Sequence, residues 1–254
     1  MSFVKNHENA SLDNWKCGIY EHGFKRIIDL LIALIALIGL FPLLVLLSVF
    51  GMVLMRGNPW FFQWRPGKKD VNGQEQIFRI IKLRTMTNDR DISGNLLPDS
   101  QRITSYGRFI RSTSLDEIFQ LINVVKGDMA LIGPRPQLVR DMVFMTEKQR
   151  KRHNVRPGIS GLAQIRGRNA LSWEGKLAAD IEYVENISFR GDVHIIFETI
   201  GKVLKRENIS SEGMDTAEDY GDYLLRIGRI TRMMYDEKQQ EANALIKAAE
   251  FHVV

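Results

Sequence analysis

Two adjacent carboxylates, Asp116 and Glu117, open a predicted helix over Leu115–Val125, whose apolar residues recur at helical spacing. One interpretation is a capping box, in which Ser114 and Glu117 satisfy free amides of the first turn. The other is chemical, because an aspartate can attack phosphorus to form an acyl phosphate. A neighbouring glutamate could hold Mg²⁺, which prefers oxygen ligands and substrate phosphates. The two interpretations are compatible, and both stay open at this point.

Two arginines near this pair in the sequence could bind a phosphate. Arg111 precedes Asp116 by five positions and is either a solvated charge or a bidentate phosphate ligand. Arg135 stands in Gly133-Pro134-Arg135-Pro136, where each proline keeps the preceding residue out of the helical region. The segment is therefore either a rigid surface turn or a stiff support for a guanidinium that binds an anion.

A strand or extended segment is predicted over Gln76–Met86. Within it, Lys82 and Arg84 alternate with Ile81 and Leu83, which would place both charges on one face. That face is either exposed to solvent or binds an anion.

Composition excludes several other chemistries. The five histidines lack metal-site spacing, and the single cysteine, Cys17, excludes cysteine-rich zinc sites and an intramolecular disulfide. Neither a phosphate-binding P-loop nor a dinucleotide fingerprint is present. A net charge of +5 could suit nucleic acid, anionic lipid or phosphorylated substrates. We expect no nucleic-acid partner, because no nucleic-acid-binding motif accompanies the charge.

A run without charges, Leu30–Met55, is long enough to cross a bilayer. Pro42 lies near its midpoint, so a helix there must kink or break. Basic residues flank both ends: Lys25 and Arg26 before it, and Arg56, Arg65, Lys68 and Lys69 after it. Since positive charge favours the cytoplasmic side, such flanks suggest entry and exit by one face. A proline-kinked span is the alternative, and physics alone slightly favours it.

The pattern predicts an α/β fold that is predominantly helical, with short strands. Beyond the elements above, we expect a short apolar segment at Met129–Ile132, helices at Leu138–His153, Trp173–Asn186, Asp192–Lys205 and Asp236–Glu250, and a short strand at Gly161–Ile165. Gly57-Asn58-Pro59 and Pro66-Gly67 indicate a loop after the apolar run, and a second loop is expected at Asn88–Ser100.

Taken together, these motifs resemble the bacterial sugar transferase family, the monotopic phosphoglycosyl transferases. The resemblance runs in order from about residue 23 to residue 206. It is carried by Lys25-Arg26 with Asp29, Lys82-x-Arg84-Thr85-Met86, Arg111-Ser-Thr-Ser-Leu-Asp116-Glu117, Leu131-Ile-Gly-Pro134-Arg135-Pro136, Arg156-Pro-Gly-Ile-Ser-Gly-Leu-Ala-Gln164 and Asp180-x-x-Tyr183-Val.

The resemblance implies transfer of a phosphosugar from a UDP-sugar to a membrane polyprenyl phosphate, with release of UMP. It implies that Asp116 is the nucleophile and forms a phosphosugar intermediate, and that Asp116 and Glu117 hold Mg²⁺. Lys82, Arg84, Arg111 and Arg135 are expected to bind phosphate and nucleotide. Neither the sugar, the glycan pathway nor a possible homo-oligomer follows from the sequence.

The resemblance also favours a re-entrant helix over a simple span. Lys25 and Arg26 would then lie at the lipid headgroups, where the acceptor binds, and the catalytic domain would face the cytoplasm at the bacterial inner membrane. The expected divisions are an N-terminal segment 1–24, a helix-break-helix 25–56 bent at Pro42, a catalytic domain 57–206 and an extension 207–254.

Two residues depart from the family pattern. Phe41 replaces a common serine before the proline, and Phe119 replaces a common proline after the acidic pair.

The alternative function is a non-catalytic membrane-anchored module that binds anionic lipid.

Overall fold

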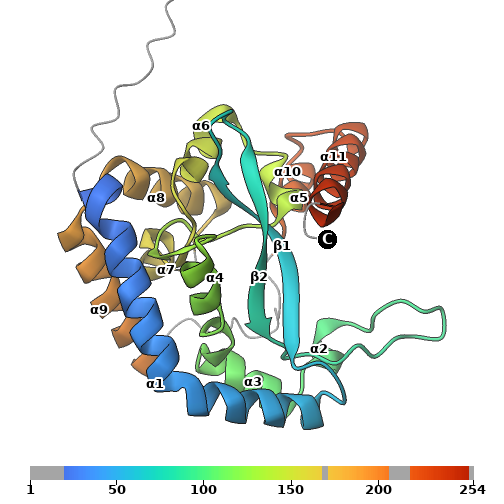
Figure 1. Ribbon diagram of the computed structural model, residues 1–254. Helices are drawn as coiled ribbons and strands as arrows, with labels where there is room; N and C mark the ends of the chain where they lie inside the picture. Colours follow the sequence, from blue (N-terminus) through green and yellow to red (C-terminus); the bar gives the residue numbers. More distant parts are fainter. Residues whose placement is uncertain (1–19, 168–170, 206–217, 252–254) are drawn as a thin grey trace, which may run out of the picture.

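The computed structural model describes residues 20–167, 171–205 and 218–251. Most of the expected N-terminal segment, with Cys17, and the start of the expected extension lie outside these residues. Within the described part, the chain is predominantly helical with short strands and one long apolar helix near the N-terminus, as expected. Figure 1 shows the strands at the centre and helices on several sides.

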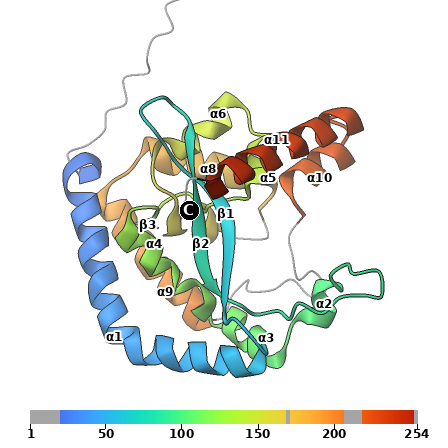
Figure 2. The ribbon, with the colours of Figure 1, turned by 45° about the vertical axis from the view of Figure 1, so that its right-hand side comes forward.

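The apolar run forms one helix, α1 (Lys25–Leu54), which follows a π-helical turn at Tyr20–Phe24. Its length and composition would allow it to cross a membrane. Helix α1 bends sharply near its middle (Figures 1 and 2), and Pro42 lies inside it. Because proline removes one helical hydrogen bond and its ring displaces the preceding turn, it is the physical cause of such a bend. The expected kink is thus present, without a break in the helical assignment.

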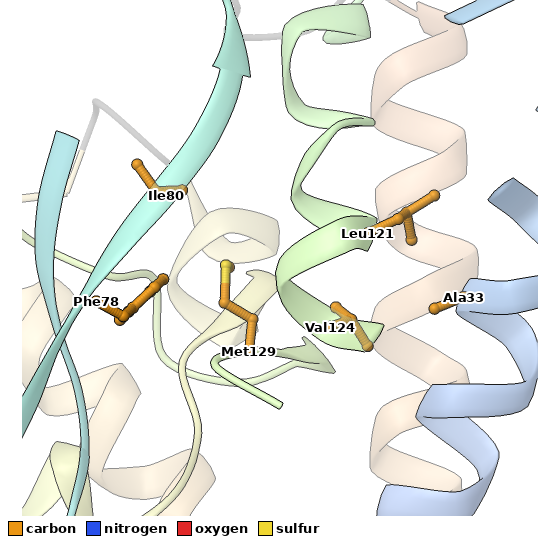
Figure 3. Packing of buried hydrophobic residues seen from close by; sticks show 6 residues of the cluster. All are labelled: Ala33, Phe78, Ile80, Leu121, Val124 and Met129. Carbon is orange, nitrogen blue, oxygen red and sulfur yellow. The ribbon is translucent and has the colours of Figure 1, made fainter. Parts of the chain in front are cut away.

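The two halves of α1 pack on different parts of the domain. Ala33 in the first half packs with Leu121 and Val124 of α4 (Gln120–Lys126), as Figure 3 shows. Leu44 and Leu47 in the second half belong to a second cluster, formed with Leu83, Ile110 and Phe119.

The outer face of α1 stays apolar and exposed. Ile35, Ile38 and Val53 are 71%, 75% and 69% exposed, respectively. A continuous exposed apolar face of this kind marks an interaction surface rather than a folded core. It fits a helix that rests in lipid on one side and on its own domain on the other.

A long antiparallel hairpin joins β1 (Trp60–Lys69) to β2 (Glu75–Leu83), with Trp60 opposite Leu83. The prediction of an extended segment at Gln76–Met86 is confirmed for most of its length. Strand β1 was missed, because Pro66-Gly67 indicated a loop. The aromatic run Trp60–Trp64 was the available signal, since aromatic residues favour strands.

A second, two-stranded parallel sheet pairs β3 (Ala130–Ile132) with β4 (Gly158–Ser160). The predicted strand at Gly161–Ile165 is wrong, because the strand ends at Ser160 and a short helix, α7 (Leu162–Arg166), follows. The backbones beyond the strands approach closely: a Cβ atom on Gly158 would lie 2.1 Å from the amide nitrogen of Gly133. This approach fixes the start of the segment that carries Arg135.

The predicted helix Leu138–His153 is wrong as one element. It divides into α5 (Val139–Met142), α6 (Glu147–Arg150) and a 3₁₀ turn, η3 (Lys151–Asn154). Helix α6 begins with a capping box of Thr146 and Gln149. A second helix therefore starts at Thr146, within a stretch whose apolar residues keep helical spacing. Because the spacing continues across this start, it predicted one long helix.

Six further helices complete the described part of the chain, and three of them were predicted. The six are α2 (Asp99–Arg102), α3 (Ser105–Ser112), α8 (Trp173–Glu185), α9 (Phe189–Lys205), α10 (Tyr220–Arg226) and α11 (Arg232–Phe251). Helices α2, α3 and α10 were not predicted, and α2 begins within the loop expected at Asn88–Ser100. Helices α8 and α9 confirm two predictions, and α11 covers the helix expected at Asp236–Glu250.

Candidate active site

The acidic pair lies on a backbone turn that is unusual for its residue type. Ser114 has φ +55° and ψ +20°, the left-handed conformation, and η2 (Leu115–Glu117) follows it directly. This conformation costs a non-glycine residue on the order of 1 kcal/mol. Ser114 makes no side-chain capping bond, so the capping-box interpretation is wrong. The predicted helix Leu115–Val125 divides here into η2 and α4.

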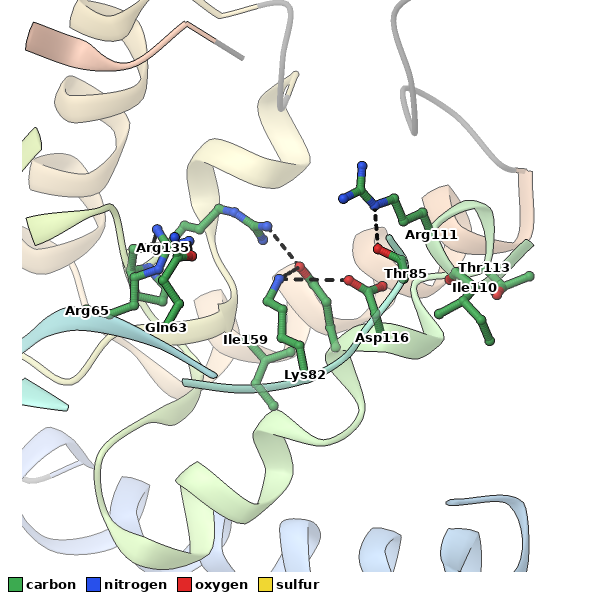
Figure 4. Close-up of polar contacts among 12 residues, drawn as sticks. Gln63, Arg65, Lys82, Thr85, Ile110, Arg111, Thr113, Asp116, Arg135 and Ile159 are labelled. Carbon is green, nitrogen blue, oxygen red and sulfur yellow. Dashed lines mark hydrogen bonds and ion pairs between the residues drawn. The ribbon is translucent and has the colours of Figure 1, made fainter. Parts of the chain in front are cut away.

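The left-handed turn ends α3 and directs both carboxylates toward β2 and the Arg135 segment. Lys82 Nζ donates to Glu117 Oε1 at 3.0 Å and lies 3.9 Å from Asp116 Oδ2. Arg135 Nη2 donates to the same Glu117 oxygen at 2.8 Å. Figure 4 shows these side chains converging from three separate segments of the chain. Four of the predicted site residues therefore meet at one place.

A buried asparagine fixes the relative position of these segments. Asn123 of α4 accepts a hydrogen bond from the amide of Ile81 at 3.0 Å and donates to the carbonyl of Arg79 at 2.8 Å. Both partners belong to β2, so α4 is tied to the free edge of the strand. Since α4 follows the acidic pair and Lys82 follows Ile81, this tie holds the carboxylates beside the lysine.

The two carboxylates have different electrostatic environments. Burial raises the pKa of Asp116 above its usual value, and Lys82 opposes this only in part. Burial would also raise the pKa of Glu117, but Arg135 and Lys82 outweigh it and hold that pKa well below its usual range. Glu117 is therefore an ionised partner held by two cations. Asp116 is the less closely held carboxylate, which suits a nucleophile.

Both carboxylates remain within reach of a ligand. The Asp116 side chain is 16% exposed and the Glu117 side chain 13%. The Arg135 side chain is 40% exposed, although its guanidinium contacts Glu117. A phosphate could thus approach Asp116 while meeting Arg135 and Lys82.

Arg111 and Arg84 are placed differently. Arg111 donates from Nε to Thr85 Oγ1 at 2.9 Å, and its charge is near enough to oppose, in small part, the rise that burial causes in the pKa of Asp116. Arg84 follows the end of β2 and donates from Nε to the carbonyl of Met86 at 2.9 Å, with a longer contact to Asn58. The structure thus brings Arg111 to the acidic pair, whereas the contacts of Arg84 are with backbone carbonyls.

Three residues that support Arg135 were not predicted as parts of the site. Arg152 Nη2 donates to the carbonyl of Arg135 at 2.5 Å, and Arg65 Nη1 donates to the carbonyl of Pro136 at 3.1 Å. Arg152 is itself held by Asp180, with both side chains 1% exposed. The spacing of Arg152 and Asp180 in the sequence, 28 positions, does not predict that they form a buried charge pair. Arg65 became recognisable only once β1 was known.

Lys25 and Arg26 make contacts inside the protein that differ from the expected headgroup contacts. The Lys25 ammonium lies 2.5 Å from Asp192 Oδ2 of α9 and 3.6 Å from Asp29 Oδ2. Arg26 donates to the carbonyls of Val124 and Val125 at the end of α4. The side chain of Lys25 is 10% exposed, so its charge points into the domain. These contacts fix the start of α1 to α4 and α9.

The donor set at the acidic pair can be compared with the needs of Mg²⁺. Among the described residues, no group of three or more His, Cys, Asp and Glu side chains could hold a metal ion. Two carboxylates are compatible with Mg²⁺, which keeps several waters and takes oxygens from substrate phosphates. Since Glu117 Oε1 already accepts from Lys82 and Arg135, Asp116 is the more available ligand.

Comparison with known proteins agrees with this arrangement. Residues 20–206 match the model of the bacterial sugar transferase family. An uncharacterized sugar transferase, EpsL, of Bacillus subtilis is 47% identical over 197 residues, which cover 77% of this chain and 95% of that protein.

Two relatives carry more specific names. The UDP-glucose:undecaprenyl-phosphate glucose-1-phosphate transferase of Caulobacter vibrioides is 33% identical, over 72% of this chain and 71% of its own length. The undecaprenyl-phosphate galactose phosphotransferase of Salmonella typhimurium is 32% identical over 82% of this chain, which spans about half of that protein (46%). The family match covers most of the chain and includes every residue of the acidic site, so the chain belongs to the bacterial sugar transferase family.

Proposed function

We propose that this chain transfers a sugar phosphate from a UDP-sugar to a polyprenyl phosphate at a membrane and releases UMP. The observation that carries the proposal is the position of Asp116. It is a partly exposed carboxylate beside Lys82, Arg135 and Arg111, in a domain that bears a long apolar helix. The names of the relatives support the acceptor and the type of group transferred.

The proposed reaction has two displacements at phosphorus. In the first, an Asp116 oxygen attacks the phosphorus that bears the sugar, the bond to the UMP oxygen breaks, and UMP leaves. In the second, an oxygen of polyprenyl phosphate attacks the same phosphorus, the bond to Asp116 breaks, and the carboxylate is regenerated. Splitting the transfer in this way lets a water-soluble donor and a lipid acceptor use the site in turn.

The charged residues around Asp116 have separate roles in this proposal. Arg135 and Arg111 bind phosphate oxygens, for which the guanidinium geometry is suited. Lys82 reduces the repulsion between the acidic pair and an incoming phosphate. Asp116 and Glu117 would hold Mg²⁺, which when bound would neutralise phosphate charge and orient the leaving group.

The test is UMP release by the full chain in detergent or lipid discs, with Mg²⁺, polyprenyl phosphate and a panel of UDP-sugars. We expect release with one donor and loss of at least 1,000-fold in Asp116→Asn, roughly the effect of removing a nucleophile. Asp236→Asn, at an exposed ion pair on α11, is the matched control and should keep full activity. Full activity of Asp116→Asn would overturn the nucleophile assignment. Salt-sensitive vesicle binding without UMP release from any donor would favour the lipid-binding module.

We further propose that α1 is re-entrant, with both ends of the chain in the cytoplasm. The bend of α1 and the basic residues on both flanks of the apolar run support this topology. Cys17 lies outside the described residues, yet it provides a chemical probe of the N-terminal side. An impermeant thiol reagent should label Cys17 in lysed cells and not in intact cells. Labelling of intact cells that is lost in Cys17→Ser would contradict the re-entrant topology.

A further inference from the structure

The helices α10 and α11 lie beyond the family match, which ends at residue 206. We call residues 218–251, which contain these helices, the C-terminal clamp. Both figures of the whole chain show α10 and α11 beside α5, on the opposite side of the hairpin from the first half of α1 (Figures 1 and 2). Helix α5 begins four residues after Arg135. The clamp therefore packs on the element that directly continues the Arg135 segment.

A buried carboxylate joins the clamp to this segment. Asp141 Oδ1 accepts a hydrogen bond from the amide of Tyr220 at 2.8 Å, and Asp141 Oδ2 accepts one from the amide of Leu138 at 3.2 Å. Asp141 is 2% exposed. One side chain thus links the first turn of α10 to a backbone amide three positions beyond Arg135.

The neighbouring Arg140 adds an ionic contact to the same junction. Its Nη1 lies 3.1 Å from Asp219 Oδ2 and its Nη2 3.7 Å from Asp222 Oδ2. Its Nη2 also donates to Tyr235 Oη of α11 at 3.3 Å. Arg140 therefore contacts both helices of the clamp.

Apolar contacts make the junction continuous. Ala242 of α11 lies in one buried cluster with Val139 and Met142 of α5 and with Val143, which follows that helix. Tyr220 packs on Trp173 of α8 with ring centroids 5.0 Å apart, and Trp173 Nε1 donates to the carbonyl of Glu218 at 3.0 Å. The clamp is consequently a packed part of the domain that lies on two elements near the site.

The Arg135 segment is thus held from two directions. Arg152 and Arg65 hold the carbonyls of Arg135 and Pro136 from within the family region. Asp141 and Arg140 hold the following residues through the clamp. An arginine whose own carbonyl and following backbone are held in this way loses less conformational freedom when it binds an anion.

We propose that the C-terminal clamp positions Arg135 for the phosphate of the donor, with Arg140 and Asp141 as positioning residues. The inference rests on the proposed function, since it takes the ligand of Arg135 to be the diphosphate of a UDP-sugar. A loosened clamp should weaken donor binding and leave the chemical step at Asp116 nearly unchanged. We expect a rise in donor KM of roughly tenfold, which corresponds to ~1.4 kcal/mol.

The test compares Arg140→Gln and Asp219→Asn, which remove the two partners of one ion pair, with their double variant. Both single variants should raise donor KM with little change in kcat, and Arg140→Gln should raise it more, because Arg140 also contacts Asp222 and Tyr235. The double variant should add little to Arg140→Gln, since Asp219 acts through Arg140. Arg140→Lys should recover part of the effect. Arg226→Gln is the matched control, because Arg226 pairs with Glu218 within the clamp and the pair is exposed.

Binding of UDP and hydrogen exchange make the outcomes distinguishable. Weaker UDP binding and faster amide exchange at residues 133–138 in Arg140→Gln, with an unchanged control, would support the clamp. Unchanged UDP affinity and unchanged exchange in Arg140→Gln would overturn it while leaving the proposed function intact. Absence of UDP binding and of UMP release in the wild-type chain would overturn the proposed function and the donor assignment with it. A fall in kcat without a change in donor KM would also overturn the positioning role.

Discussion

Lys82 and Glu117 meet across 35 positions of sequence, with Nζ of the lysine 3.0 Å from Oε1 of the glutamate. The same ammonium lies 3.9 Å from Asp116 Oδ2, so one cation serves two adjacent carboxylates. Without it, Asp116 would be a buried acid next to an ionised acid, and both effects disfavour its charged form. Since the proposed attack by Asp116 needs an ionised carboxylate, we expect the lysine to favour that form as well as to hold the acidic pair in place.

Lys82→Met should therefore lower kcat/KM for UMP release by about 100-fold, which corresponds to ~2.7 kcal/mol. Lys82→Arg should retain part of the activity, because it keeps the charge with a different geometry. The measurement is UMP release with the donor identified from the panel, together with a thermal melt to confirm folding. Activity of Lys82→Met within a factor of two of the wild type would exclude this role.

Ser114 provides a test of the backbone turn. Because its side chain makes no capping bond and φ is +55°, Ser114→Gly and Ser114→Ala should both retain UMP release. Ser114→Val should lose stability by about 1–2 kcal/mol and lose activity, since a β-branched residue fits the left-handed region poorly. Thermal melts and UMP release of the three variants are the measurement. A capping box would instead make Ser114→Ala the damaging change, at about 1 kcal/mol.

The four predicted site residues that meet in the structure were recognised from local patterns in the sequence. Lys82 follows from a strand pattern, Asp116 and Glu117 from a motif, and Arg135 from two prolines that restrict its backbone. Their meeting point was not readable from spacing, because it depends on the tie between Asn123 and β2. Local sequence patterns identified these four residues, but only the contact of Asn123 with β2 brings them together.

The parts that were missed depend on competing local signals. Strand β1 contains Pro66 and Gly67, which indicated a loop, although the residues before them favour a strand. The periodicity over Leu138–His153 outweighed the capping signal at Thr146, so one helix was predicted where the chain forms three short elements. The buried position of Lys25 depends on Asp192, a partner 167 positions away. A charge pair between residues so far apart in the sequence produces no periodic pattern from which it could be predicted.

The Lys25–Asp192 pair gives a third prediction. Lys25→Met would leave Asp192 and Asp29 buried without their cation, which typically costs about 3–5 kcal/mol. We expect a lower melting temperature for the chain in detergent micelles. Restoring charge balance with Asp192→Asn in the same chain should recover part of the loss.

A matched control separates this structural role from the headgroup role expected from the sequence. Lys68, an exposed lysine after the apolar run, should tolerate Lys68→Met with an unchanged melting temperature. If Lys25→Met and Lys68→Met both weaken vesicle binding and neither changes the melting temperature, the buried pair is not what holds α1 on the domain.

The fourth prediction concerns acid stability and rests on His153, which follows Arg152, the residue that holds the carbonyl of Arg135. The ring is 3% exposed, and Nδ1 lies 3.1 Å from Glu75 Oε1. Burial lowers the pKa of His153 to about 4, against 6.5 for an unperturbed histidine. Below pH 6.5 the unfolded chain binds a proton that the folded chain does not. The free energy of unfolding should therefore fall as the pH falls from 6.5 to 4, by up to about 3 kcal/mol from this group.

Carboxylates also titrate in the acid range, and their contributions must be separated from that of His153; Glu75, which contacts the ring, and Asp141 are two of them. The pKa of Glu75 is lowered to about 2, because its bonds to His153 and Arg150 outweigh burial, so it adds a loss of stability below its unfolded pKa of 4.5. Burial raises the pKa of Asp141 to about 6, so it acts in the opposite direction and favours the folded state as the pH falls from 6 toward 3.8.

The measurement is the difference in stability between the wild type and His153→Gln, from melts at each pH from 7 to 4.5. Contributions that both chains share cancel in this difference to a first approximation. The stability advantage of the wild type should shrink steadily on acidification, whereas His194→Gln, at an exposed histidine on α9, should follow the wild-type curve. Parallel curves for wild type and His153→Gln would mean that the pKa of His153 is the same in the folded and the unfolded chain. A wild-type advantage that grows on acidification would mean that the folded chain holds the ring protonated, as an ion pair with Glu75.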